Sequence, residues 1–195
     1  MNPRQRAIKR IFDVVVAGAV LLVGWPFLVA LAILIRIDSP GSPIFRQQRA
    51  GRGTKPFAVY KFRTMRTGAE PYGVSPKSEE DPRLTRLGRW LRETALDELP
   101  QLWNVFTGDM SLVGPRPLYM SQAREFTPRQ RRRLEVRPGL TGLAQVSGRG
   151  ELPHDQKLEI DVQYVEQACL LLDLRILWRS MTQIYAGRKA YQKWD

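Results

Sequence analysis

The sequence predicts a predominantly helical α+β fold in two parts, a membrane-inserted segment over residues 1–38 and a soluble domain over residues 39–195. Three observations lead to this prediction. An uncharged apolar run comes first, two short strand-like runs follow it, and most of the remaining chain carries apolar residues at helical spacing. With 195 residues, 43% of them hydrophobic, the soluble part is long enough to bury one core.

The apolar run covers residues 14–35 and would measure about 33 Å as a helix, close to the thickness of a bilayer's hydrocarbon core. A single spanning helix is the simplest interpretation. However, basic residues flank the run on both sides, and basic flanks prefer the cytoplasmic side of a membrane. Pro26, beside Trp25 near the middle, removes a backbone hydrogen bond and kinks or breaks a helix. We therefore expect a re-entrant helix-break-helix, which makes the protein monotopic.

The formal net charge of +12 favours anionic partners, which include nucleotides, nucleic acids and phospholipid headgroups. The single cysteine, Cys169, excludes an internal disulfide, and with the single histidine, His154, it argues against a zinc site of the usual Cys/His kind. Any catalysis should therefore rest on carboxylates, hydroxyls and cations.

Residues 44–48 and 57–63 read as two strands joined by a turn-rich segment, which predicts a β-hairpin. Alternation places Lys61 and Arg63 on one face, about 6–7 Å apart, a spacing that suits two oxygens of a diphosphate. An edge strand that carries charge against aggregation would show the same pattern. The polar residues 67–81 that follow are expected to form a mobile loop, which could act as a lid.

Asp97 and Glu98 form a carboxylate pair within this basic chain. Such a pair weakens binding of a polyanion, so its presence points to metal binding or nucleophilic attack. Acids in the first turn of a helix are also stabilised by the helix dipole and need no chemistry. The density of candidate phosphate-binding residues nearby favours the chemical interpretation.

Two stiff loops supply several of these candidates. Pro115 and Pro117 fix the backbone around Arg116, so its guanidinium group has little entropy left to lose. The glycine-punctuated segment 137–142 could cradle a phosphate or a nucleotide, and the side chains after it could read a base or a ribose edge. Ordinary structural loops would explain each segment alone. The candidates in this second loop and just after it are Arg137, Gly139, Thr141, Gln145 and Arg149.

The C-terminal part should be helical. Thr127 and Gln130 form a capping box, and the three arginines at 131–133 are expected to face headgroups or solvent. An apolar stripe runs through residues 174–185, with Asp173 as its expected cap. Either packing in the core or lying in a membrane interface would explain this stripe.

Three ordered motifs then resemble the bacterial sugar transferase family, the monotopic phosphoglycosyl transferases, and nearly the whole chain matches the family's minimal members. The motifs are KFRTM at 61–65, DPRLTRLGRWLRETALDELPQLWNVFTGDMSLVGPRP at 81–117 and RPGLTGLAQVSGR at 137–149. One departure is Trp25-Pro26, where the family's membrane break is Ser-Pro, so a hydroxyl that could satisfy freed backbone groups is missing.

The resemblance implies an enzyme at the cytoplasmic face of the bacterial inner membrane that initiates glycoconjugate synthesis. Its members transfer a sugar phosphate from a UDP-sugar to polyprenol (undecaprenyl) phosphate and release UMP. The family pattern makes Asp97 the nucleophile and Glu98 its assistant, with Mg²⁺ beside both acids. The same pattern places five cationic residues around the diphosphate: Lys61, Arg63, Arg92, Arg116 and Arg137.

A covalent intermediate on Asp97 predicts ping-pong kinetics, because the product UMP leaves before the lipid phosphate attacks. The alternative is a membrane-attached protein that binds nucleic acid or anionic lipid without catalysis. A nucleic-acid binder should interleave exposed aromatic residues with its basic ones, whereas most Trp and Tyr residues here fall on apolar stripes. We therefore expect anionic membrane lipids, and not nucleic acid, as partners.

Overall fold

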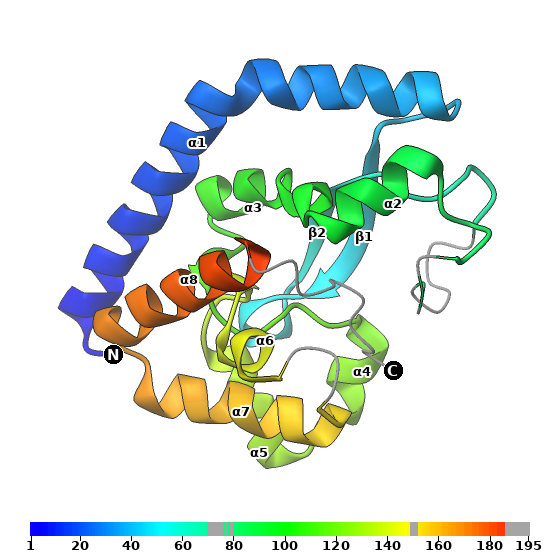
Figure 1. Cartoon of the computed structure of the whole chain (residues 1–195). Coiled ribbons are helices and arrows are strands. Elements are labelled where there is room, and N and C mark those ends of the chain that lie inside the picture. Colours follow the sequence, from blue (N-terminus) through cyan, green and yellow to red (C-terminus); the bar gives the residue numbers. More distant parts are fainter. Residues whose placement is uncertain (70–75, 77, 79, 149–151, 186–195) are drawn as a thin grey trace.

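The computed structural model of the chain describes residues 1–69, 76, 78, 80–148 and 152–185. Helices dominate the described part, and two small sheets are the strand component, in agreement with the predicted α+β class (Figure 1). The elements in chain order are α1 (Pro3–Asp38), β1 (Ile44–Ala50), η1 (Arg52–Thr54), β2 (Pro56–Phe62), α2 (Arg86–Glu93), η2 (Leu96–Glu98), α3 (Gln101–Thr107), β3 (Ser111–Val113), α4 (Met120–Glu125), α5 (Pro128–Arg131), η3 (Arg132–Glu135), β4 (Gly139–Thr141), α6 (Leu143–Gly148), α7 (His154–Gln167) and α8 (Leu170–Tyr185).

The N-terminal apolar segment is one long bent helix, α1. Asn2 caps its first turn, where its Oδ1 accepts a hydrogen bond of 2.8 Å from the Gln5 backbone N–H. Figure 1 shows two arms at an angle, and the helix continues through Pro26. The predicted break is therefore a bend within a continuous helix, because a proline ring displaces the preceding turn without ending it. Within the described part of the chain, α1 alone is long and apolar enough to cross a membrane, and most of its apolar side chains are exposed.

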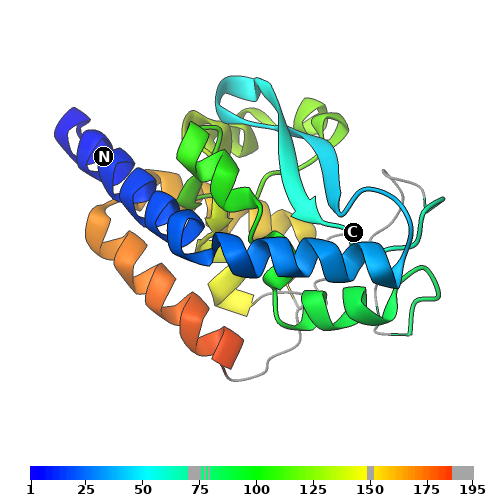
Figure 2. The same ribbon diagram turned by 90° about the horizontal axis from the view of Figure 1, so that it is seen from above.

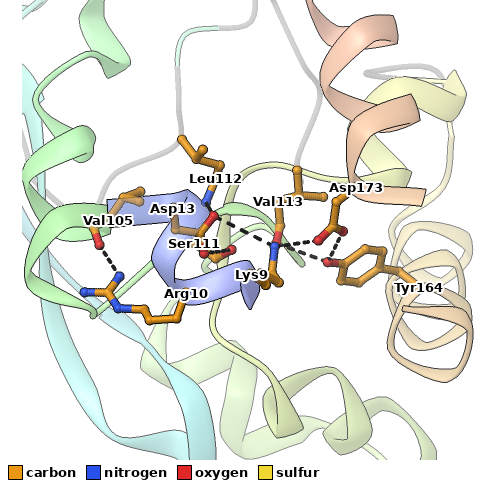
Figure 3. A network of polar contacts seen from close by, with 9 residues as sticks. All are labelled: Lys9, Arg10, Asp13, Val105, Ser111, Leu112, Val113, Tyr164 and Asp173. Atoms are coloured by element: carbon orange, nitrogen blue, oxygen red, sulfur yellow. Dashed lines mark hydrogen bonds and ion pairs between the residues drawn. The ribbon is translucent and has the colours of Figure 1, made fainter. Parts of the chain in front are cut away.

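The first arm of α1 is fixed to the body by buried polar contacts (Figure 3). Asp13 accepts hydrogen bonds from the Ser111 hydroxyl, at 2.7 Å, and from the Leu112 backbone N–H, at 3.1 Å, both in β3. Lys9 pairs with Asp173 of α8 at 2.7 Å. Asp173 lies within α8 and is buried, so the prediction that it caps this helix was wrong.

The second arm lies against α2 and the hairpin. Leu31 and Ile35 are buried there with Phe62 of β2 and Leu91 of α2. Figure 2 shows α1 along one side of the molecule, with α8 beside the first arm and α2 beside the second. Both ends of the helix therefore contact the same globular body.

The predicted hairpin is confirmed. Strands β1 and β2 pair antiparallel, with Ile44 opposite Phe62 and Ala50 opposite Pro56. Asn104 of α3 joins its helix to the middle of the hairpin, because its amide donates to the Ala58 carbonyl at 2.7 Å and accepts from the Tyr60 N–H at 3.1 Å. This junction sets the position of the acids that precede α3.

The two stiff loops meet in a second sheet, in which β3 and β4 run parallel. Three glycines allow the close approach: a Cβ on Gly139 would lie 2.0 Å from the Gly114 nitrogen, and one on Gly142 would lie 2.2 Å from the Gly114 oxygen. No larger side chain fits between the two loops, so the glycines here serve the packing of backbone on backbone.

The predicted faces of the C-terminal helices are partly confirmed. Leu158 and Val162 of α7 are buried, as expected for core. In α8, Leu174, Trp178 and Met181 are exposed, and Ile176 is the buried residue. Between the two open interpretations of the α8 stripe, its exposure favours the interface.

Arg133 corrects the expectation that residues 131–133 face headgroups or solvent. The predicted capping box forms at the start of α5, and Arg131 beyond it is exposed. Arg133, in η3, is buried and pairs with the buried Asp161 of α7 at 2.6 Å. Its Nη2 also donates to the Arg116 carbonyl at 2.6 Å, so a buried ion pair supports the loop that carries Arg116.

Candidate active site

A reversal of the chain after α2 places the two acids. Ala95 adopts the left-handed conformation, with φ of 56°, and directs the chain from α2 into the 3-10 turn η2. Asp97 and Glu98 occupy η2, ahead of α3. They therefore do not lie in the first turn of an α-helix, and the dipole explanation does not account for them.

Glu98 is held by two cations from different parts of the fold. Its Oε1 accepts from Lys61 Nζ of β2 at 2.6 Å and from Arg116 Nη2 at 3.1 Å. Burial alone would raise the pKa of Glu98, but Lys61 and Arg116 outweigh it and lower the pKa to about 2. Glu98 is therefore a fixed anion that joins the hairpin to the loop after β3.

Asp97 has a different environment. It is 8% exposed and lines a cavity of about 230 Å³. Among the described residues, no group donates a hydrogen bond to its carboxylate, and burial raises its pKa to about 6 against the opposing effect of Lys61. The carboxylate is thus available to a ligand in the cavity.

The cavity is strongly cationic. Of the described residues that line it, Asp97 is the only acid, whereas five are arginine or lysine. Arg92 of α2 is oriented by Thr64, whose hydroxyl accepts from Arg92 Nε at 2.9 Å. The five cationic residues are Arg49, Lys61, Arg63, Arg66 and Arg92.

Arg63 lies at the edge of this cavity but is bound elsewhere. Its guanidinium group donates to the backbone carbonyls of Ser39 and Pro40 and, at 3.4 Å, to that of Ile35. These carbonyls belong to the last turn of α1 and the residues just after it, so Arg63 caps that helix. Lys61 and Arg63 both line the cavity, but Arg63 lies one residue beyond β2 and its guanidinium group also donates to these carbonyls.

The second stiff loop does not line the cavity. Arg137 Nε donates to the Gly108 carbonyl at the end of α3, at 2.7 Å. Gly139 and Thr141 form backbone hydrogen bonds of 2.9 Å with Pro115 and Gly114 respectively. Gly139, Thr141 and Pro115 thus fix the Arg116 loop through its backbone, and none of the three lines this cavity.

Gln145, predicted to read a base or ribose edge, is 6% exposed at the start of α6, and its amide has no partner among the described residues. It is absent from the described lining of the cavity. Arg149 lies outside the described residues. The predicted lid over 67–81 is described only in part, and its residues 67–69 and 76 line the cavity.

The cavity residues that the sequence reasoning missed include Gln47 and Arg49 of β1, Arg66, which follows β2, and Tyr119, which precedes α4. The strand pairing of the hairpin shows how Gln47 and Arg49 could have been found. Phe45 lies opposite Lys61, so alternation puts Gln47 and Arg49 on the same face as Lys61. Sequence reasoning treated Arg49 only as one of the charges flanking the apolar run.

The acids fit Mg²⁺ in one respect. Mg²⁺ is bound in proteins through one or two carboxylates, with waters and substrate phosphates as the remaining ligands. Asp97 offers a carboxylate without a hydrogen-bond donor, and Glu98 keeps Oε2 without one among the described residues. Among the described residues, no three His, Cys, Asp or Glu side chains lie close enough together to hold a metal ion. Substrate oxygens and waters would therefore have to complete the coordination shell of Mg²⁺.

Comparison with known proteins places the chain in a family. It is 38% identical over 194 residues to the UDP-glucose:undecaprenyl-phosphate glucose-1-phosphate transferase of Escherichia coli (strain K12), a match that covers 95% of this chain and 42% of that protein. It is 42% identical to the uncharacterized sugar transferase EpsL of Bacillus subtilis (strain 168), with 95% and 91% covered. A transferase of the same name as the first, from Caulobacter vibrioides, is 41% identical, with 94% and 72% covered.

The chain thus spans less than half of the Escherichia coli relative and most of the Bacillus subtilis one. The model of the bacterial sugar transferase family matches residues 4–187 of this chain, which extend from the first turn of α1 to just beyond the end of α8. The matched region includes the bent helix, both acids and every described residue that lines the cavity. The chain belongs to the bacterial sugar transferase family.

Proposed function

We propose that the protein transfers a sugar phosphate from a UDP-sugar to undecaprenyl phosphate and releases UMP. The observation that carries this proposal is Asp97, a buried carboxylate in a cavity lined by cations, to which no described residue donates a hydrogen bond. Two relatives support it by their names. The Escherichia coli protein is a UDP-glucose:undecaprenyl-phosphate glucose-1-phosphate transferase, and the Aeromonas hydrophila protein is a UDP-N-acetylgalactosamine-undecaprenyl-phosphate N-acetylgalactosaminephosphotransferase.

The reaction proceeds in two displacements at one phosphorus atom. A carboxylate oxygen of Asp97 bonds to the phosphorus next to the sugar, the bond from that phosphorus to the bridging oxygen breaks, and UMP leaves with the electron pair. An oxygen of the lipid phosphate then attacks the same phosphorus and displaces the Asp97 carboxylate. A raised pKa makes this carboxylate a better nucleophile than an ordinary aspartate, and the scheme is ping-pong.

The cations make the attack on an anion feasible. Lys61 and Arg92 line the cavity with Asp97 and offset negative charge on the phosphoryl oxygens. Glu98 holds Lys61 and Arg116 in place and limits the net positive charge beside them. When bound, Mg²⁺ supplies further neutralisation of phosphate charge, and Asp97 and Glu98 are the residues that would hold it.

Membrane attachment belongs to the same proposal. We infer that residues 1–38 form a re-entrant segment and that residues 39–195 are the catalytic domain on the cytoplasmic face of the inner membrane. Contacts at both ends of α1 with one globular body support this topology. The exposed apolar side chains of α8 support contact with membrane lipids, and its Arg175 and Arg179 suit anionic headgroups.

The decisive variant is Asp97→Asn, which keeps the shape of the side chain and removes the nucleophile. With a UDP-sugar, Mg²⁺ and a short polyprenol phosphate, UMP release should fall by about 10³-fold or more. Asp109→Asn is the matched control, because Asp109 is an exposed aspartate just after α3 and should retain full activity. The wild-type protein given UDP-sugar alone should gain the mass of a sugar phosphate on Asp97. Lipid-dependent UMP release that survives in Asp97→Asn contradicts the proposal.

A further inference from the structure

Arg49 lines the same cavity as Asp97. It belongs to neither of the two stiff loops, and no ion pair joins it to Asp97 or Glu98 in the described part of the chain. It is next to last in β1, and the hairpin register places it on the face of the sheet that carries Lys61. Arg46, three residues earlier on the same strand, lies on the other face. That residue is exposed, and its guanidinium carbon lies 5.5 Å from the centre of the Tyr60 ring.

The guanidinium group of Arg49 is held in one orientation by neutral groups. Its central carbon lies 3.6 Å from the centre of the Tyr119 ring, and Nη2 donates to Gln47 Oε1 at 2.5 Å. Gln47 Nε2 also donates to the Tyr119 hydroxyl at 3.4 Å, so the three side chains brace one another. Stacking on an aromatic ring leaves the edge of a guanidinium group open to hydrogen-bond acceptors.

Other buried or half-buried arginines of the described chain have a clear partner. Arg133 pairs with Asp161, Arg116 with Glu98, and Arg63 caps the end of α1. Arg49 has no carboxylate within ion-pair distance among the described residues. Burial lowers the pKa of Arg49 to about 10, so the group is desolvated but remains cationic at neutral pH.

A desolvated cation without a carboxylate partner is costly unless a ligand supplies the opposite charge. The anion that suits a planar guanidinium edge is a phosphate, which accepts two parallel hydrogen bonds. Of the five N–H groups of Arg49, one donates to Gln47 and a further one bonds to the Tyr119 hydroxyl, and the cavity that the side chain lines gives a ligand access to the guanidinium group.

We propose that Arg49 is a substrate-binding residue of this cavity, oriented by Tyr119 and Gln47, that binds a phosphate group of the reactants. The identification of the ligand rests on the proposed function. Its phosphate comes either from the diphosphate of the nucleotide donor or from the head of the lipid acceptor. These two sources share one chemistry and differ in which substrate loses affinity when Arg49 is changed.

The test compares Arg49→Met with Arg46→Met, which removes a cation from the same strand but outside the cavity. Steady-state kinetics with each substrate varied in turn, and calorimetric binding of UDP, give the readouts. Loss of a charge-assisted hydrogen bond should weaken the binding of one substrate by about 10- to 100-fold. A higher Kd for UDP together with a higher KM for UDP-sugar would show that Arg49 binds the donor's diphosphate. A higher KM for the lipid with unchanged UDP binding would show that it binds the phosphate of the acceptor. Arg46→Met should change each constant by less than about threefold.

Gln47→Glu provides a second variant that leaves Arg49 in place. The new carboxylate would neutralise the guanidinium group and should reproduce most of the Arg49→Met defect, while Arg49→Lys, which keeps the charge, should recover part of it. Thermal unfolding of each variant checks that the fold is intact.

Substrate constants in Arg49→Met and Gln47→Glu that equal those of the wild type would overturn the proposal. Arg49-dependent binding of UDP or inorganic pyrophosphate by a protein without turnover would instead leave Arg49 as a phosphate-binding residue and refute the transferase reaction. A wild-type protein that binds neither anion and has no turnover would overturn both.

Discussion

Asp97 and Glu98 are neighbours in the chain, but their carboxyl groups have opposite surroundings. Lys61 and Arg116 hold Glu98 ionised, with a pKa near 2, whereas burial brings the pKa of Asp97 to about 6. Paired titratable groups with separated pKa values mark a division of roles in many active sites. Here the division leaves the Asp97 carboxylate open to a ligand in the cavity, as the proposed nucleophilic role requires, and commits Glu98 to holding two cations.

Glu98→Gln tests that division. The change leaves Lys61 and Arg116 half-buried without their common countercharge, so we expect a loss of about 1–3 kcal/mol in the free energy of unfolding. The rate of UMP release should fall by about 10- to 100-fold, less than in Asp97→Asn, because the nucleophile remains. Chemical denaturation and the UMP assay measure the two effects.

Glu159→Gln is the control for this comparison, since Glu159 pairs with Arg129 on the exposed surface. Surface pairs contribute little, and this variant should be close to wild type in both measurements. A Glu98→Gln protein as stable as the wild type would show that Glu98 does not hold the two cations in place.

Sequence reasoning at the scale of single residues found the acid pair, Lys61 and Arg116, because each lies in a distinctive local pattern. It did not foresee that Arg133 is buried, since three consecutive arginines look alike until α7 packs against one of them. It also paired Arg63 with Lys61 by strand alternation, which stops applying where β2 ends. Contacts between distant segments decide both cases.

At the scale of elements, the small parallel sheet determines where Arg116 lies. The loops after β3 and before β4 meet through glycine backbone, and Arg133 binds the Arg116 carbonyl from behind. The prolines and glycines of the two loops predicted stiffness, which stays a prediction. Their mutual contact was not predictable, because each loop read alone is equally consistent with a phosphate cradle.

Gly139→Ala should disrupt this sheet. An added methyl group would lie 2.0 Å from the Gly114 nitrogen, so the strands must separate, at a cost of about 2 kcal/mol or more in the free energy of unfolding. UMP release should fall with it, because the Arg116 loop moves. Denaturation curves and the UMP assay in parallel detect both changes.

Gly24→Ala is the control for Gly139→Ala, because it makes the same change at a glycine without close neighbours. A methyl group there meets nothing within 4 Å and lies inside α1, where alanine is the better helix former. We expect unchanged or slightly higher stability. Equal effects of the two substitutions would contradict the close backbone contact between β3 and β4.

At the scale of the whole molecule, α1 determines how the protein meets a membrane. From Pro26 the sequence predicted a kink or break in this segment, and the structure has a bent but continuous helix. From the flanking charges it predicted that both ends lie on one side of the membrane, which stays a prediction. It did not predict the contacts that attach α1 to the rest of the protein. Asp13 accepts hydrogen bonds from β3, Lys9 pairs with Asp173 of α8, and Arg63 caps the C-terminal end of the helix. Those partners come from distant parts of the sequence, which composition and hydropathy do not reveal.

Cysteine labelling tests the topology. The proposed re-entrant topology puts both ends of α1 on the cytoplasmic side. In a Cys169→Ser background, a cysteine at Asn2 and one at the exposed Lys55 should then both resist a membrane-impermeant thiol reagent in intact cells and react after lysis. The cysteine at Lys55 reports the side of the soluble domain. Labelling at position 2 alone from outside would establish a spanning helix.

The cap that Arg63 places on α1 also has an electrostatic consequence. A helix as long as α1 ends in several unsatisfied carbonyl groups, which together act as about half a negative charge. This negative pole lies beside the cavity, because Arg63 both contacts those carbonyls and lines the cavity wall. By donating to the Ile35 carbonyl and to those of Ser39 and Pro40 just beyond the helix, Arg63 offsets part of this negative charge beside the cavity. The proposed phosphate ligand would therefore meet less repulsion from the end of α1.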